Sequence, residues 1–296
     1  MGVSCSVFLS DKKIGSNQMK VVLLAGGYGT RIMEESESRP KPMVEIGDMP
    51  ILWHIMKEYS YYGFHDFIVC AGYKHYMIKK WFADYFFYTS DMMFDFTDCR
   101  PDWSMEAEYQ GEPAATRGDR RITVLDHYTE PWKVTVVDTG LGTNTGGRIK
   151  KIQPYVGNET FMMTYGDGVC DVDIGRLVEF HQEHGKLATL TSVVRNQTKG
   201  MLDVANDNTV RSFREKSHKD DDLINAGYMV LEPEVFGYLT ENTVFETDAL
   251  SKLAEEGQLM SYQHEGFWQC MDTLQEKLLL EQMINSGDAP WVKWEM

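Results

Sequence analysis

Residues 20–31 read Lys-Val-Val-Leu-Leu-Ala-Gly-Gly-Tyr-Gly-Thr-Arg, and residues 40–43 read Pro-Lys-Pro-Met. The run Val21–Ala25 is wholly apolar and ends in two glycines, which is typical of a central parallel strand buried on both faces. Glycine lets the main chain turn tightly and approach a ligand closely, so backbone N–H groups of residues 26–29 can lie against phosphate groups. The segment is neither a P-loop, which ends in Gly-Lys-Ser/Thr, nor a Rossmann Gly-x-Gly-x-x-Gly fingerprint.

Two cations, Arg31 and Lys41, follow these glycines closely in the sequence. Near a triphosphate, two fixed cations would neutralise the charge that builds on the phosphoryl oxygens during in-line displacement. The competing interpretation is an ordinary tight turn with two solvated cations, because many turns contain a glycine cluster. The spacing alone leaves both interpretations open.

Strand and helix patterns alternate along the rest of the chain. This alternation predicts an α/β fold with a Rossmann-like, mixed but mainly parallel sheet, helices on both faces and small β additions. In such a fold, ligands lie at the carboxyl ends of the strands. The predicted strands are Val21–Ala25, Asp66–Ala71, Phe161–Tyr165, Leu187–Val194, Val210–Phe213 and Ala226–Leu231. The predicted helices are Pro50–Tyr62, Lys74–Phe87, Val172–His184, Glu246–Glu255 and Thr273–Ile284, and residues 98–121 are predicted to form a long loop.

Two aspartates are candidate Mg²⁺ ligands. Asp167 lies between glycines where the strand Phe161–Tyr165 ends, and a carboxylate there can hold Mg²⁺ while leaving room for phosphate and water. Asp272, just before a predicted helix, is the natural second ligand. Taken one at a time, each aspartate could instead form an Asx turn or a helix N-cap.

The composition excludes several partners. The formal net charge of −16 argues against nucleic acid and anionic membranes, because both require a basic surface. Five cysteines without a Cys-x-x-Cys pair are typical of reduced thiols in a cytosol. We therefore expect a cytoplasmic protein that binds neither nucleic acid nor a membrane.

These motifs, in this order, resemble the sugar-1-phosphate nucleotidyltransferase family, and within it the cytidylyl branch that acts on glucose 1-phosphate. The resemblance covers nearly the whole segment from Met19 to Trp294. The blocks at 50–57 (Pro-Ile-Leu-Trp-His-Ile-Met-Lys) and 266–274 (Gly-Phe-Trp-Gln-Cys-Met-Asp-Thr-Leu) point to the cytidylyl branch. The resemblance also rests on residues 23–31, a signature common to the superfamily, and on the blocks at 40–47, 137–140, 145–148 and 164–169.

The resemblance implies the fold shared by nucleotidyltransferases and type-A glycosyltransferases. It implies a single domain at 19–296 with an acceptor-binding part around 195–270, after a tail at 1–18 that we expect to be disordered. The implied reaction moves CMP from CTP to a sugar 1-phosphate with the help of Mg²⁺, which gives a CDP-sugar and pyrophosphate. The sugar phosphate is already anionic at pH 7 and attacks the α-phosphorus directly, so no general base is needed. We also expect a homo-oligomer.

The resemblance further implies three groups of site residues, with Arg31 and Lys41 as the catalytic pair. The nucleotide would be bound by Leu24, Ala25, Gly26, Gly27, Gly29, Thr30, Arg31, Lys41, Gly147 and Arg148. The acceptor would be bound by Tyr165, Lys216 and Asn225, and Mg²⁺ by Asp167 and Asp272. Without the resemblance, Lys216 could be one charge in a solvated turn.

Two segments in the acceptor region depart from the pattern of the glucose enzymes. Residues 199–203 read Lys-Gly-Met-Leu-Asp instead of Phe-Gly-Ala-Leu-Asp, and Ser217 follows Glu215-Lys216 where proline is common. Lys199 and Met201 add a cation and a larger side chain. A different phosphorylated acceptor therefore stays open as an alternative.

Two further alternatives are a nucleotide- or sugar-phosphate-sensing subunit without turnover, and a glycosyltransferase. Retention of the catalytic pair and both candidate Mg²⁺ ligands argues against the sensor, because binding alone would not require the whole set. A glycosyltransferase would need an Asp-x-Asp metal motif beside its nucleotide. Asp171-Val-Asp173 has this spelling, but it follows the strand end at a predicted helix start.

Overall fold

The computed structural model describes residues 19–29, 38–95, 122–194, 201–204, 210–214 and 223–294. The predictions for the tail 1–18, the loop 98–121, Thr30, Arg31, Lys199, Lys216 and Ser217 lie outside these described residues. Met201 lies in a strand of which only the backbone is described. No helix in the described ranges has the length and apolar content needed to cross a bilayer.

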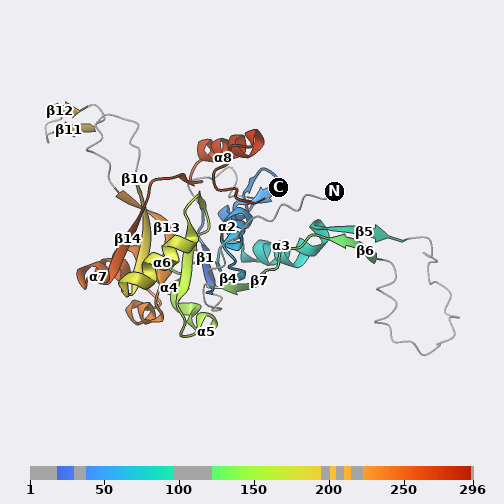
Figure 1. Cartoon of the computed structure of the whole chain (residues 1–296), viewed down its shortest axis with the longest axis horizontal. Helices are drawn as coiled ribbons and strands as arrows, with labels where there is room; N and C mark the ends of the chain where they lie inside the picture. The colour runs from blue at the N-terminus through green and yellow to red at the C-terminus, as the bar shows by residue number, and fades with distance from the viewer. Residues whose placement is uncertain are drawn as a thin grey trace, which may run out of the picture.

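A seven-stranded sheet forms the centre of the molecule (Figure 1). Its strands, in spatial order, are β14 (Leu259–His264), β10 (Ala188–Val194), β13 (Leu223–Leu231), β8 (Phe161–Tyr165), β1 (Val21–Ala25), β4 (Asp66–Ala71) and β7 (Lys133–Asp138). Four of the six pairings are parallel, and only β13 runs against its neighbours β8 and β10. The prediction of a mixed, mainly parallel sheet is confirmed.

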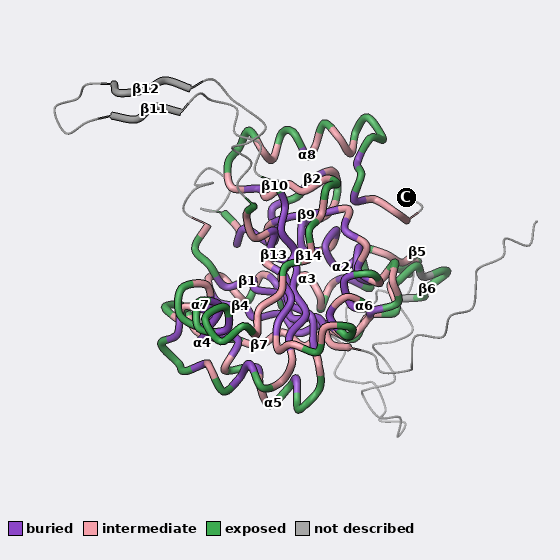
Figure 2. The backbone as a smooth tube through the Cα atoms, turned by 60° about the vertical axis from the view of Figure 1, so that its left-hand side comes forward, coloured by how far each residue is buried: buried purple, intermediate pink, exposed green. Residues whose placement is uncertain are grey.

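Strand β1 lies between β8 and β4, and all five of its residues are buried. Val21, Leu23 and Ala25 face one apolar core, while Val22 and Leu24 face a second core on the other side. Figure 2 shows the buried backbone concentrated along these central strands. This alternation explains why the run is apolar throughout, since a strand covered on both faces presents neither side to water.

Helices cover both faces of the sheet. The first core packs beneath α2 (Ile51–Tyr61) and α6 (Ile174–His184), whereas the second packs beneath α4 (Thr145–Lys151), α5 (Gln153–Val156) and α7 (Leu250–Glu255). The remaining helices are α3 (His75–Tyr88), α8 (Leu274–Ser286), the short turns η1 (Lys41–Met43) and η4 (Pro233–Tyr238), and the π-helix η5 (Phe245–Ala249).

Several helices and strands begin a few residues away from their predicted boundaries, and local backbone conformation explains the differences for α2 and α3. Helix α2 starts one residue late because Pro50 is its extended N-cap rather than part of its first turn. Helix α3 starts after Lys74, which has a left-handed backbone (φ 47°) that a helix cannot include. Strand β13 begins at Leu223, three residues before the predicted start. The predicted helix at 246–255 is a π-helix that continues into α7.

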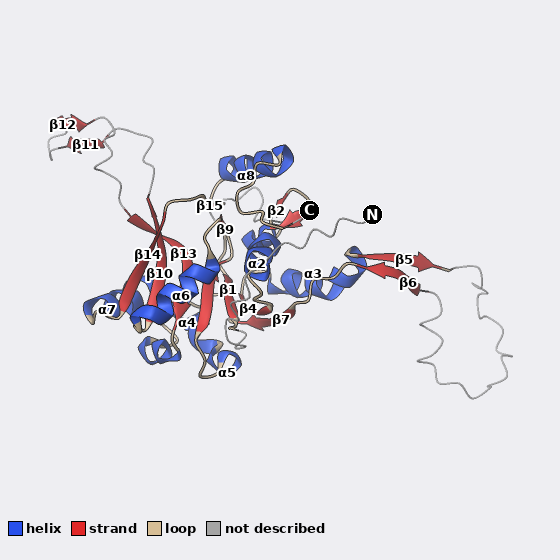
Figure 3. Ribbon diagram, viewed as in Figure 1, coloured by secondary structure: helices blue, strands red, loops and turns tan. Residues whose placement is uncertain are grey.

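The sequence analysis missed several short elements. These are the edge strands β7 and β14, the helices α4 and α5, and the turns η1 and η4. Three strand pairs were missed as well: β2 (Glu45–Ile46) with β3 (Met49–Pro50), β5 (Ser90–Phe94) with β6 (Ile122–His127), and β9 (Gly168–Cys170) with β15 (Trp268–Cys270). Strands β11 (Met201–Val204) and β12 (Val210–Arg214) form a further separate pair, of which only β12 was predicted. Figure 3 shows β9 and β15 together at the end of the sheet nearest α8.

Truncating the centre of β1 should be strongly destabilising. Leu23→Ala removes a fully buried side chain and leaves a cavity, so we expect a loss of about 2–5 kcal/mol in the free energy of unfolding, measured by urea denaturation. Leu278→Ala is the matched control, because Leu278 on α8 is 53% exposed and should cost far less. Equal losses in the two variants would contradict this assignment of the core.

Candidate active site

A cleft of about 530 Å³ opens where β1 and β8 end. These strands are parallel neighbours, so the residues that follow them, Gly26 and Gly166, lie side by side at one edge of the sheet. The cleft is lined by Leu24, Ala25, Gly26, Gly27, Tyr28, Gly29, Lys41, Pro42, Leu141, Gly142, Thr143, Asn144, Thr145, Arg148, Tyr165, Gly166, Asp167, Val244, Glu246 and Asp272. Most of the described residues that the sequence analysis assigned to the site meet here.

Lys41 joins the two predicted Mg²⁺ ligands. Its Nζ donates to Asp167 Oδ2 and to Asp272 Oδ1, each at 2.6 Å, and the three side chains are 10%, 32% and 21% exposed. Burial lowers the pKa of Lys41, but the two carboxylates outweigh burial and the pKa is raised above its ordinary value. The side chain is therefore an ammonium ion at neutral pH, held between two carboxylates.

Close backbone approach brings these residues together. A Cβ atom on Gly166 would lie 2.9 Å from the carbonyl oxygen of Leu24 and 3.2 Å from Pro42, so only glycine lets the chain after β8 pack against β1 and the Pro-Lys-Pro segment. The pairing of β9 with β15 then sets Asp167 beside Asp272. Met271 N donates to Asp167 O at 2.8 Å, which fixes this arrangement through the backbone.

Asp272 does not cap the helix that follows it. Thr273 is the N-cap of α8 and forms a capping box with Glu276, whose carboxylate also accepts from the N–H of Asp272 at 2.7 Å. The carboxylate of Asp272 is therefore left to face the cleft. The sequence analysis left open that Asp272 is a helix N-cap, but the N-cap of α8 is the next residue, Thr273.

The same donor set fits Mg²⁺. Two carboxylate oxygens from different strand ends converge on a single cation, and here the Lys41 ammonium stands in that position. Oxygen ligands from one or two carboxylates, with space for water and phosphate, are what Mg²⁺ prefers in proteins. Asp167 and Asp272 are the residues that would hold the ion.

The Arg148 side chain packs against the glycine loop and is bonded to its backbone. Its guanidinium is buried and donates to Gly26 O at 3.0 Å, Gly140 O at 2.7 Å and Thr139 Oγ1 at 2.7 Å. Burial lowers the pKa of this arginine. A Cβ atom on Gly26 would lie 2.2 Å from Arg148 Nη1, so the glycine is required by the arginine packed against it.

Gly147 and Asn225 are not among the residues that line the cleft. A Cβ atom on Gly147 would lie 2.2 Å from Glu241 O, so its glycine is explained by packing of α4 against residues 241–243. Asn225 Oδ1 accepts from Gly227 N at 2.8 Å, and its side chain lies beside the Tyr165 hydroxyl.

The sequence analysis missed Glu246, which lines the cleft from η5. It accepts from Tyr165 Oη and from Thr145 Oγ1, both at 2.6 Å, and so connects the end of β8 to the start of α4. Glu246 belongs to a π-helix, a rare element that is frequently found at functional sites. No local pattern around residue 246 could have shown this role, because both partners are about 80 to 100 residues away in the sequence.

Neither aspartate of the Asp171-Val-Asp173 segment lines the cleft. Asp173 is the N-cap of α6 and accepts from Arg176 N, while Asp171 accepts from His264. Both aspartates therefore have hydrogen-bond partners outside the cleft, and the Asp-x-Asp metal motif of a glycosyltransferase is not needed to explain them.

The fold and the cleft together place a glycine loop, a lysine and two carboxylates at the carboxyl ends of parallel strands. A model of the nucleotidyl transferase family matches residues 20–282, and the chain belongs to this family. It is 47% identical over 279 residues to glucose-1-phosphate cytidylyltransferase from Salmonella typhimurium, covering 94% of this chain and 100% of that protein.

More distant matches also cover most of this chain. Mannose-1-phosphate guanyltransferase from Saccharomyces cerevisiae is 29% identical over 267 residues, covering 88% of this chain and 62% of that protein. Among solved structures, HddC from Yersinia pseudotuberculosis has a TM-score of 0.61 at 22% identity, over 90% of this chain and 99% of that one. An apo UDP-glucose pyrophosphorylase has a TM-score of 0.60 at 16% identity, over 91% and 98%. These structures show the shared fold.

Removing the ammonium should strengthen divalent-ion binding in the absence of nucleotide. In Lys41→Met the two carboxylates lose the cation between them, so we expect Mn²⁺, titrated by electron paramagnetic resonance, to bind at least about tenfold more tightly. Lys150→Met is the matched control, because Lys150 Nζ donates to Gln153 and Phe236 O outside the cleft. Unchanged or weaker Mn²⁺ binding in Lys41→Met would show that the lysine and the ion do not compete.

Proposed function

We propose that the chain transfers CMP from CTP to glucose 1-phosphate, forming CDP-glucose and releasing pyrophosphate. The single observation that carries this function is the 47% identity to a glucose-1-phosphate cytidylyltransferase along that protein's whole length. The cleft supports it, because a lysine and two carboxylates converge beside a glycine loop at the ends of β1 and β8.

The residues of the cleft have distinct roles in this reaction. Backbone N–H groups after β1 contact the triphosphate, and Arg148 keeps this loop fixed through its bond to Gly26 O. Lys41 leaves the carboxylates when substrate binds and places its ammonium against the reacting phosphates, where it stabilises the charge of the transition state. When Mg²⁺ is bound, it supplies further neutralisation of phosphate charge at Asp167 and Asp272.

The acceptor lies on the side of the cleft lined by Tyr165, at the end of β8, which pairs with β13. Its phosphate oxygen is anionic at neutral pH, so the protein has only to position it in line with the α-phosphorus. Glu246 fixes the Tyr165 hydroxyl, and Asn225 lies beside that hydroxyl. We assign Tyr165, Asn225 and Lys216 to the acceptor, within the part of the chain around residues 195–270. We also propose that the reaction takes place in the cytoplasm, where thiols such as Cys170 stay reduced.

Turnover should depend on the ion-paired residues. We expect Lys41→Ala and Asp167→Asn each to lower the rate of pyrophosphate release by about two orders of magnitude or more, with far-ultraviolet circular dichroism unchanged. Asp66→Asn is the control, because Asp66 pairs with Lys133 at the opposite end of β4 from the cleft.

The same assay distinguishes the alternatives. Purified protein is tested with each of four nucleoside triphosphates against a panel of sugar 1-phosphates and other phosphomonoesters. Release with CTP and glucose 1-phosphate supports the proposed reaction. Release with CTP and only another acceptor identifies a different cytidylyltransferase, while no release with any acceptor would indicate the non-catalytic sensor.

We further propose that the chain is a homo-oligomer in which a second copy covers the β5–β6 pair. This pair extends away from the sheet after α3, as Figure 1 shows. Large apolar side chains are exposed there and at the end of α3, namely Phe86, Phe87, Tyr88, Met93, Phe94, Val124, Leu125 and Tyr128. Apolar surface gathered in this way is unusual for a monomer.

A charge introduced on this surface should weaken the assembly. Leu125 on β6 is 66% exposed, so we expect Leu125→Asp to shift the mass measured by light scattering toward the monomer without lowering the thermal midpoint of the isolated chain. Leu278→Asp on α8 is the control, as a similarly exposed leucine outside this surface. A monomeric mass for the unmodified protein at micromolar concentration would rule the assembly out.

A further inference from the structure

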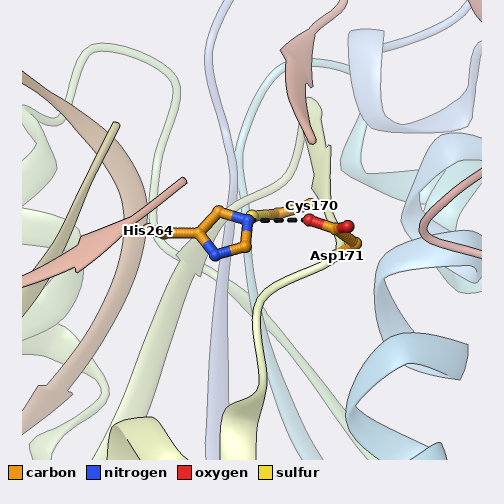
Figure 4. A group of neighbouring side chains, drawn as sticks. All are labelled: Cys170, Asp171 and His264. Carbon is orange, nitrogen blue, oxygen red and sulfur yellow. Dashed lines mark hydrogen bonds and ion pairs between the residues drawn. The ribbon is translucent and has the colours of Figure 1, made fainter. Parts of the chain in front are cut away.

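Three ligand-type side chains gather at the end of the β9–β15 pair that lies away from Asp167 and Asp272. Cys170 ends β9, Asp171 follows it, and His264 ends β14. One donor atom from each of these side chains, a sulfur, a carboxylate oxygen and an imidazole nitrogen, lies within 4.8 Å of the others. Figure 4 shows the His264 ring facing the Asp171 carboxylate with Cys170 beside them. The group takes no part in the cleft.

The backbone fixes all three positions, and His264 is held in the main sheet opposite Val193 of β10. Asp171 N donates to Phe267 O at 3.1 Å, and Lys293 Nζ donates to Asp171 O at 2.8 Å. Cys170 N donates to Glu58 Oε1 at 3.3 Å, inside the core. The donor atoms are therefore held by the fold rather than gathered by chance on a mobile surface.

Gly266 makes room for the group. A Cβ atom there would lie 2.3 Å from Asp171 Oδ1 and 2.6 Å from the His264 ring, so any other residue would displace one of the two side chains. The exposed fractions are 12% for the His264 side chain and 28% for that of Asp171, and Cys170 is buried. The group is thus sheltered on one side and reachable from solvent on the other.

We propose that Cys170, Asp171 and His264 form a binding site for a transition-metal ion of the Zn²⁺ class, separate from the Mg²⁺ site in the cleft. Thiolate, imidazole and carboxylate together are ligands that suit Zn²⁺ and Co²⁺, whereas Mg²⁺ takes oxygen ligands. The hydrogen bond from His264 to Asp171 explains why these two side chains lie together. It does not explain why a cysteine, Cys170, lies beside them.

The separations are close to those a tetrahedral ion requires. Bonds of about 2.0–2.3 Å to nitrogen, oxygen and sulfur place the donor atoms roughly 3.3–3.7 Å apart. His264 Nε2 and Asp171 Oδ1 are 2.7 Å apart, so they would separate slightly while the sulfur moves inward. Three protein ligands leave the fourth position to water, as in open zinc sites.

Binding at this site releases a proton. Ions of this class bind a cysteine as the thiolate, so the Cys170 thiol proton passes to solvent when the ion binds. His264 would bind the ion through Nε2, which lies nearest Asp171. No electron transfer or further reactant is involved.

An ion here would cross-link β9 to β14 of the main sheet. Asp167 and Asp272 lie at the other end of the β9–β15 pair. The ion would therefore restrict the motion of the two strands that position both cleft carboxylates. Because the unfolded chain does not hold the three ligands together, binding also stabilises the folded state by mass action.

The test is titration of Co²⁺ into the full-length reduced protein in a large excess of Mg²⁺, which occupies the oxygen-ligand site. We expect a single equivalent of Co²⁺ to produce a thiolate-to-cobalt charge-transfer band and visible absorption of tetrahedral type. An indicator dye in weak buffer should report one proton released per ion. Asp171→Asn keeps an oxygen that accepts from His264 but loses the anionic ligand, and we expect its Co²⁺ affinity to fall by more than about tenfold.

Cysteine variants assign the band. Cys170→Ala should abolish it, whereas Cys70→Ala, which removes another fully buried thiol on β4, should retain it. Should Cys170→Ala fail to fold, His264→Gln provides the same test from the opposite ligand. The proposal is overturned if the unmodified protein shows no charge-transfer band, or if the band persists when Cys170 or His264 is replaced.

Discussion

The ion triplet of Lys41, Asp167 and Asp272 is the interaction on which the site depends. Its members come from η1, from the turn between β8 and β9, and from the segment before α8, so the triplet joins three distant parts of the chain. Two carboxylates this close repel each other unless a cation lies between them. One ammonium between two carboxylates leaves the group with a net negative charge, and this charge favours binding of a divalent cation. In a chain with net charge −16, it also keeps a cation where anionic substrates must arrive.

Two glycines at neighbouring strand ends, Gly26 after β1 and Gly72 after β4, have a steric reason that the sequence does not show. Both lie so close to the Arg148 guanidinium that a Cβ atom would stand 2.2 Å and 2.5 Å from Nη1, respectively. Gly26 of the glycine motif is therefore required in part by an arginine of the same protein, which packs against the loop and also lines the cleft. The loop is fixed through the bond from Arg148 to Gly26 O before any ligand enters the cleft.

The parts of the fold that could be predicted from sequence are those whose pattern is set locally. The bounds of β1, β4 and β8 agree with the prediction because each strand is a continuous apolar run ended by a turn. Strand β7 was missed because it is a half-exposed edge strand with polar residues at both ends, and β9 and β15 are only three residues long.

The same limit applies to the site. Lys41, Asp167 and Asp272 could be proposed because each lies in a distinctive short motif. Glu246 could not, since its role arises when a π-helix packs between β8 and α4. For Arg148, the sequence indicated a place near the nucleotide but not the backbone oxygens that occupy its guanidinium.

The reversed direction of β13 brings two kinds of strand terminus to the edge of the sheet where the cleft opens. Parallel strands β1 and β8 reach this edge with their carboxyl ends, whereas β13 starts there, and Asn225 lies near that start. The start of β13 can therefore be substituted without altering the loops that follow β1 and β8, because these belong to separate segments of the chain. In the proposed reaction, the contacts to the acceptor and the contacts to the nucleotide would then vary independently.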